Sequence, residues 1–304
     1  MTPRKLALLA ALATTVAGCG VGAGTSSSGV SLTVTDGFGK RVVVLKDDMK
    51  THGEDTVMRL LQRNAKVATR FSGGFVQSVD GLSGQAGSTP VDWFFFVNGV
   101  EGSKGSASVR VHEGDQVWWD RHDWAAAMDV PAVVGSYPEP FLHGIGGKRL
   151  PVRIECSPPN APGCKDVSDL LGKAGVVAAR GGLAASFTKE TLRILVGLWP
   201  AIRDDPAAKQ IEQGPQVSGV FARMAPNGKS LALLDTSGHA TRTLGPGTGL
   251  IAATSFEHGK PVWVVTGTDV QGLTDAAQSL ESGVLRNRFA LVTDQGKPLS
   301  APER

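Results

Sequence analysis

Alternating apolar and polar residues predict two strands at the start of a folded unit that spans residues 30–126. Val30, Leu32 and Val34 alternate with Ser and Thr, which is the period-2 pattern of a half-buried strand. The turn sequence Asp-Gly-Phe-Gly follows at residues 36–39, and residues 41–45 are mostly apolar. The sequence therefore predicts a β-hairpin.

Helical spacing replaces this alternation in residues 57–65. The apolar residues of that stretch fall on one helical face, and Thr51 or Asp55 is a candidate cap for the first turn. Further short strands, separated by turns rich in Gly, Ser and Asp, are predicted at residues 67–71, 75–79, 93–97, 108–112 and 116–120.

Strand and helix patterns alternate in a second unit, residues 130–293, after a connection that contains four prolines. Strands are predicted at residues 152–156, 192–196, 220–222, 231–234, 250–253, 262–265 and 289–292. Helices are predicted at residues 167–174, 207–213 and 269–280, the last capped by Asp269. The polar residues 294–304 are expected to form a frayed tail. The fold class is thus α+β, with an α/β second domain.

Aromatic residues are concentrated between positions 93 and 124, where four of the six tryptophans lie. Strand alternation places Trp93 and Phe95 on one face and Phe94 and Phe96 on the other. Both faces are therefore apolar, and the face away from the domain's own core must be covered by the second domain or a partner, or must bind a ligand. Ordinary strand and core packing is the simpler explanation. The candidate ligand-binding residues are Trp93, Phe95, Trp119, His122 and Trp124.

The order of short motifs in residues 30–124 resembles the transcobalamin C-terminal-like domain family. The motifs are Ser31-Leu32-Thr33-Val34, Val57-Met58-Arg59-Leu60-Leu61, Gly73-Gly74-Phe75-Val76, Asp80-Gly81, Asp92-Trp93, Asn98-Gly99, Gly105 and Gly114-Asp115. The resemblance implies a β-grasp-like fold in which a helix crosses a sheet. In cobalamin carriers this module forms one wall of the vitamin pocket, and the helical barrel that forms the other wall is missing here. Cobalamin is therefore a candidate ligand, and no other cofactor is expected.

Asp120 and His122 fall on the same strand face and, together with Asp123, are candidates for a metal site. His122 is also a candidate base or axial ligand to cobalt. We identify no third metal ligand, so a solvated strand end is the favoured interpretation and no metal is expected.

Other motifs in the second unit are weaker. The glycine-rich residues 245–249 lack the Lys-Ser/Thr of a phosphate-binding loop. The strand-to-helix step at residues 264–269 could bind an anion, although a simple helix cap is the more common use. Ser218 and Ser237, near Asp235 and His239, form no known nucleophile motif. We therefore expect no catalytic site.

The N-terminus has the layout of an export signal. Arg4 and Lys5 precede an uncharged stretch, residues 6–18, and Cys19 follows small residues. This arrangement resembles the lipobox of bacterial lipoproteins, in which the cysteine is acylated and becomes the mature N-terminus. The alternative is a plain secretory signal with a chance cysteine. Residues 1–18 are thus the expected signal peptide, and residues 19–29 the expected flexible tether.

The two remaining cysteines, Cys156 and Cys164, flank a loop rich in proline. Outside the cytoplasm such a pair is expected to oxidise, and closing this loop stabilises a fold by about 2.5 kcal/mol in the chain-entropy model. A metal site is the weaker alternative, because no further ligand pair lies at suitable spacing.

Charge excludes one class of partner. Without residues 1–18 the chain has 29 basic and 28 acidic residues, so it lacks the basic surface of nucleic-acid-binding proteins. We expect a protein held by lipid on the outer face of the cell membrane. Its expected role is non-catalytic binding of a small molecule or an envelope partner. The alternatives are an accessory envelope protein that uses its aromatic faces for protein packing, and, less favoured, a hydrolase of the cell envelope.

Overall fold

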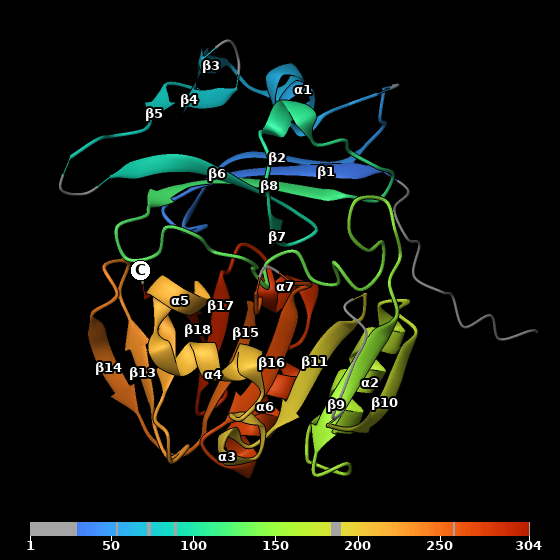
Figure 1. Ribbon diagram of the computed structural model, residues 1–304, viewed down its shortest axis with the longest axis vertical. Helices are drawn as coiled ribbons and strands as arrows, with labels where there is room; N and C mark the ends of the chain where they lie inside the picture. Colours follow the sequence, from blue (N-terminus) through green and yellow to red (C-terminus); the bar gives the residue numbers. More distant parts are fainter. Residues whose placement is uncertain are drawn as a thin grey trace, which may run out of the picture.

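The computed structural model describes residues 29–52, 54–71, 74–87, 90–183, 190–257 and 259–303 (Figure 1). The expected signal peptide, the lipidation site Cys19 and the tether up to residue 28 lie outside the described residues. The remainder combines several sheets with helices, which confirms the α+β class.

The N-terminal unit is a mixed five-stranded sheet with a helix on one face (Figure 1). Its order is β2 (Arg41–Met49), β1 (Val30–Asp36), β8 (Gln116–Asp123), β6 (Val91–Val97) and β7 (Val100–Glu101). β1 and β8 are parallel, and the other pairs are antiparallel. Above the sheet lie α1 (Val57–Asn64) and a small sheet of β3 (Val67–Arg70), β4 (Phe75–Val79) and β5 (Leu82–Ser83).

The predicted hairpin of β1 and β2 is confirmed, and two local predictions are wrong. Thr56 caps α1 by accepting a hydrogen bond from the Arg59 amide, while Asp55 pairs with Arg63 instead. Residues 108–112 do not form a strand. The chain makes a 3₁₀ turn at Ser106–Ser108, and only one bridge joins this stretch to Thr56.

The second unit is built on a seven-stranded sheet. Its order is β10 (Ala178–Gly182), β9 (Val152–Ser157), β11 (Leu192–Gly197), β16 (Val262–Gly267), β15 (Thr248–Thr254), β17 (Ala290–Asp294) and β18 (Lys297–Ala301). The first four strands are parallel and the last three are added antiparallel. Every residue of β11, β15 and β16 is buried, as expected for strands covered on both faces.

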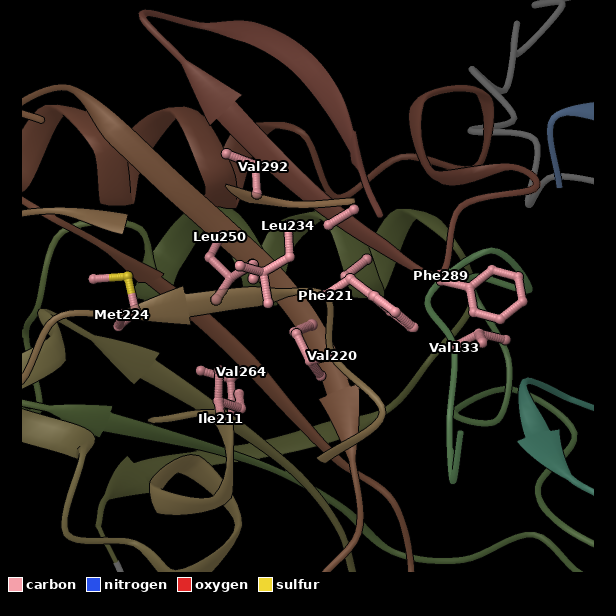
Figure 2. Packing of buried hydrophobic residues seen from close by; sticks show 14 of the residues in the cluster. Val133, Ile211, Val220, Phe221, Met224, Leu234, Leu250, Val264, Phe289 and Val292 are labelled. Atoms are coloured by element: carbon pink, nitrogen blue, oxygen red, sulfur yellow. The ribbon is translucent and has the colours of Figure 1, made fainter. Parts of the chain in front are cut away.

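Different elements cover the two faces of this sheet. One face carries α2 (Cys164–Lys173), α6 (Val270–Gln278) and α7 (Ser282–Leu285). The other carries α3 (Trp199–Ile202), α4 (Pro206–Gln213) and α5 (Pro215–Ser218), with a small sheet of β12 (Ala222–Met224), β13 (Leu231–Leu234) and β14 (Ala240–Leu244). Figure 2 shows this second core, where Leu250, Val264 and Val292 of the large sheet face Ile211 and Met224.

Three strands of the second unit were not predicted, namely β10, β14 and β18. The stretch at residues 297–301, expected to fray, instead pairs along its length with β17. The strand predicted at residues 220–222 begins only at Ala222. β14 and β18 are edge strands with several exposed residues, so they lack the apolar alternation by which strands are recognised.

The predicted disulfide is present. Cys156 on β9 and Cys164 at the start of α2 are bonded, with their Cα atoms 6.2 Å apart. Both are buried in the core beneath α2 and α6, so the bond ties the helix to the sheet from within.

None of the helices in the described ranges is long and apolar enough to cross a membrane.

Candidate functional site

The two units meet through the face of the N-terminal sheet that is turned away from α1, called here the lower face (Figure 1). Residues paired in register on β1 and β8 share this face, as Thr33 does with Trp118 and Thr35 with Asp120. The aromatic half of the face packs against Phe289 of the second unit. The Phe289 ring centroid lies 5.3 Å from that of Trp118 and 5.7 Å from that of Phe96. These side chains belong to the same hydrophobic cluster as the core of the second unit, so domain packing covers this aromatic face.

A hydrogen-bond network around the buried Asp120 carboxylate lies next to this contact between the units. Asp120 accepts hydrogen bonds from the amides of Phe38 (2.9 Å) and Gly39 (2.7 Å) and from the Thr35 hydroxyl. Thr35 in turn accepts one from the Trp118 indole at 2.7 Å. The network holds the β1–β2 turn against β8. That turn also touches the second unit, since a Cβ at Gly39 would lie 2.0 Å from the Asn287 carbonyl oxygen.

His122 belongs to this network. Its Nδ1 lies 2.9 Å from Asp120, and its ring is enclosed by Phe38, Phe94 and Phe289. The sequence correctly placed Asp120 and His122 on one face, but the solvated strand end was wrong, because both are almost completely buried. Among the described residues, no group of three or more His, Cys, Asp or Glu side chains is arranged to hold a metal ion.

The opposite aromatic face forms the core of the N-terminal unit. Trp93, Phe95 and Trp119 pack beneath α1, and each is at most 9% exposed. A ligand would reach these three side chains only if the domain opened. In this structure, the aromatic face that we considered as a ligand-binding surface is therefore buried. Trp124, at the end of β8, is half-buried.

The polar half of the lower sheet face remains uncovered and roofs a cavity of about 710 Å³ between the units. Ser31 and Thr33 of β1 and Gln116 of β8 line this roof. The floor comes from residues 135–149, the C-terminal end of α2 and the start of α7. Its volume lies within the range of small-molecule sites, about 300–1,000 Å³.

Glu139 and His143 form a pair in the cavity floor. The Glu139 carboxylate accepts hydrogen bonds from the His143 amide at 2.9 Å and from its Nδ1 at 2.5 Å. Burial raises the pKa of Glu139, and the contacts with His143 oppose that shift. The His143 ring lies directly against Gly114, which leaves no room for a Cβ there. The pair thus forms a polar part of the cavity wall.

Charged groups of both signs surround the cavity. Asp47 forms an ion pair with Arg286 at 3.9 Å, and Asp48 has a partner within the protein. Arg149 and Lys173 also line the cavity, and neither side chain forms an ion pair or hydrogen bond with another residue in the described ranges.

The sequence did not reveal these cavity residues. Glu139 and His143 lie in the segment interpreted as a proline-rich connection, but most of residues 130–145 are buried between the units. An acid and a histidine four residues apart, flanked by prolines, were the available signal.

The remaining sequence motifs serve local structure. The Asp269 carboxylate caps α6 at the Gly272 amide and also accepts a hydrogen bond from the Gly247 amide, each at 2.8 Å. A carboxylate therefore occupies the place where an anion would bind, which confirms the simple cap. Ser218 hydrogen-bonds the Gly214 carbonyl, and Asp235 accepts bonds from its own turn.

Glu101, where β7 meets the connection between the units, is expected to make stability depend on pH. Burial raises its pKa to about 8, and the nearby Asp129 carboxylate adds to the shift. The folded state thus binds the proton more tightly than the unfolded state. The contribution of Glu101 to the free energy of unfolding is fully present below the unfolded pKa of 4.5. It is lost as the pH rises through about 8, with a slope of at most about 1.4 kcal/mol per pH unit.

Glu101→Gln should remove this slope and stabilise the protein most above pH 8. Urea denaturation at pH 5, 7 and 9 measures the effect, with the exposed Glu113→Gln as control. A wild-type minus Glu101→Gln difference that does not change with pH would contradict the assignment.

Two comparisons with known proteins bear on this chain. The model of a family described as a domain of unknown function, DUF4430, matches residues 54–123. No curated protein has a matching sequence. The matched range runs from the approach to α1 to the end of β8, so it includes His122 and the aromatic strands but only a small part of the cavity lining.

Proposed function

We propose that this protein binds a small molecule without catalysing a reaction, and that the ligand occupies the cavity between its two units. The observation that carries the proposal is the uncovered polar half of the lower sheet face. The rest of that face is buried against the second unit, whereas Ser31, Thr33 and Gln116 face a cavity of about 710 Å³.

The N-terminal unit supports a relation to transcobalamin-like modules. The sheet order β2-β1-β8-β6-β7, with β1 parallel to β8 and a helix on one face, is the arrangement expected of a β-grasp-like domain. In cobalamin carriers such a module forms one wall of the ligand pocket. Here the second unit takes the place of the other wall, and cobalamin is one ligand to test.

The protein is proposed to act outside the cytoplasm, anchored by lipid at Cys19. The lipobox-like residues ahead of Cys19 support the anchor, and the buried disulfide between Cys156 and Cys164 supports an oxidising compartment. The alternative role in packing other envelope proteins loses its main argument, because this chain covers both of its own aromatic faces.

Native mass spectrometry of the full chain, extracted with detergent from the membrane fraction, tests both parts of the proposal. We expect wild type to retain a small molecule, and added cobalamin tests the candidate ligand that the family resemblance suggests. Thr33→Trp should abolish binding by filling the cavity. Val217→Trp, at a side chain 43% exposed on α5, an element that contributes no residue to the cavity lining, should leave it unchanged.

Two outcomes would refute the proposal. Equal ligand retention by wild type and Thr33→Trp would exclude the cavity as the site. Cys19→Ala that remains in the membrane fraction and incorporates a fatty-acid analogue as wild type does would exclude the anchor.

A further inference from the structure

We infer that the ligand of this cavity is an anionic polyol, a small organic molecule with several hydroxyl groups and one carboxylate or phosphate group. The inference rests on the proposed function, because it assigns the chemistry of the ligand in that same cavity.

The acidic side chains that line the cavity all interact with other groups of the protein. Asp47 pairs with Arg286, Glu139 accepts two hydrogen bonds from His143, and Asp48 has its own partner. Each of these acids therefore already interacts with another group of the protein and is not presented unpaired to a ligand.

Among the charged residues that line the cavity, Arg149 and Lys173 form no ion pair or hydrogen bond with another described residue, and both side chains are exposed to solvent. Lys173 lies in the last turn of α2, where the helix dipole alone stabilises a positive charge. Arg149 lies outside any helix, at the rim of the cavity, with its side chain open to solvent and to a ligand. Its guanidinium can hold a carboxylate or a phosphate with two parallel hydrogen bonds, so we assign it as the main anion-binding group.

The roof of the cavity supplies the complementary neutral chemistry. The hydroxyls of Ser31 and Thr33 and the amide of Gln116 each donate and accept hydrogen bonds. Neighbouring ligand hydroxyls need such groups of both kinds, whereas an apolar ligand would leave them unpaired. The combination of this roof with Arg149 below selects a ligand that is both hydroxylated and anionic.

Isothermal titration calorimetry of the full chain tests the inference with four probes: glucuronate, glucose 6-phosphate, glucose and inorganic phosphate. We expect glucuronate or glucose 6-phosphate to bind at least about tenfold more tightly than glucose and phosphate. Which of the two binds better distinguishes a carboxylate from a phosphate ligand. Arg149→Ala should weaken binding by about tenfold or more, and Arg149→Lys by less. Arg180→Ala, an exposed arginine outside the cavity lining, should have no effect.

The inference fails if glucose binds as tightly as glucuronate, or if inorganic phosphate alone binds as tightly as glucose 6-phosphate. It also fails if none of the probes binds while mass spectrometry shows another compound that Thr33→Trp displaces; the proposed function then stands. If Thr33→Trp displaces nothing, the proposed function fails as well.

Discussion

Asp120→Asn is expected to destabilise the protein by about 3 kcal/mol, although the two side chains have the same shape. The carboxylate accepts hydrogen bonds on both oxygens, from the amides of Phe38 and Gly39, from the Thr35 hydroxyl and from His122. An asparagine amide has one oxygen and one NH₂ group, so in either orientation it points donors at donors. Because Asp120 is fully buried, water cannot replace the lost acceptor.

Urea denaturation followed by tryptophan fluorescence measures this effect, since Trp118 hydrogen-bonds to the network through Thr35. Thr35→Val should cost about 1–2 kcal/mol, because it leaves the Trp118 indole without its acceptor. Asp123→Asn is the matched control, as its side chain is only half-buried and the amide oxygen can still accept from the Ala125 amide. Similar losses for Asp120→Asn and Asp123→Asn would show that the network contributes no special stability.

Gly272→Ala should destabilise the protein by about 3 kcal/mol or more, even though alanine favours helices. A Cβ at this position of α6 would lie 2.1 Å from the Thr248 carbonyl oxygen and 2.5 Å from its carbonyl carbon. The opposing surface is equally close, since a Cβ at Gly249 would lie 2.2 Å from the Gly272 oxygen. The contacting atoms on α6 and on β15 both belong to the backbone, so an added Cβ can be accommodated only if α6 moves away from β15.

The same substitution in α2 provides the control. Gly172 has no atom within 4 Å of a Cβ position, so Gly172→Ala should stabilise the protein by about 0.5–1 kcal/mol through helix propensity. Thermal and urea denaturation of both variants compares the signs directly. A stabilising effect of Gly272→Ala would mean that α6 is not seated as closely on the sheet as described.

Local periodicity was sufficient for most of the secondary structure. The alternation at Val30, Leu32 and Val34 predicted β1, and the apolar runs at residues 250–253 and 262–265 predicted β15 and β16. Periodicity failed to predict strands that form through backbone pairing with a neighbouring strand. Residues 297–301 contain only two apolar side chains, Leu299 and Ala301, together with Pro298, yet they form β18 because β17 offers an unpaired edge for backbone hydrogen bonds.

The candidate site was less predictable than the fold. Alternation correctly separated Trp93 and Phe95 from Phe94 and Phe96, but it carries no information about which face the helix α1 covers. The cavity lining was beyond reach for a related reason. Ser31, Gln116, Glu139 and Lys173 come from four distant segments, and no spacing along the chain connects them.

The sequence alone determined which residues share a strand or helix face, because those periods follow from backbone geometry. It also determined the pairing of Cys156 with Cys164, since no other cysteine lies in the two folded units. Only the tertiary structure decided that His122 is buried, that Asp120 fastens the β1–β2 turn and that half of one sheet face stays open. These features depend on how far the second unit covers the first. Part of that cover is the packing of Phe289 against Trp118, residues far apart in the chain whose contact no local pattern encodes.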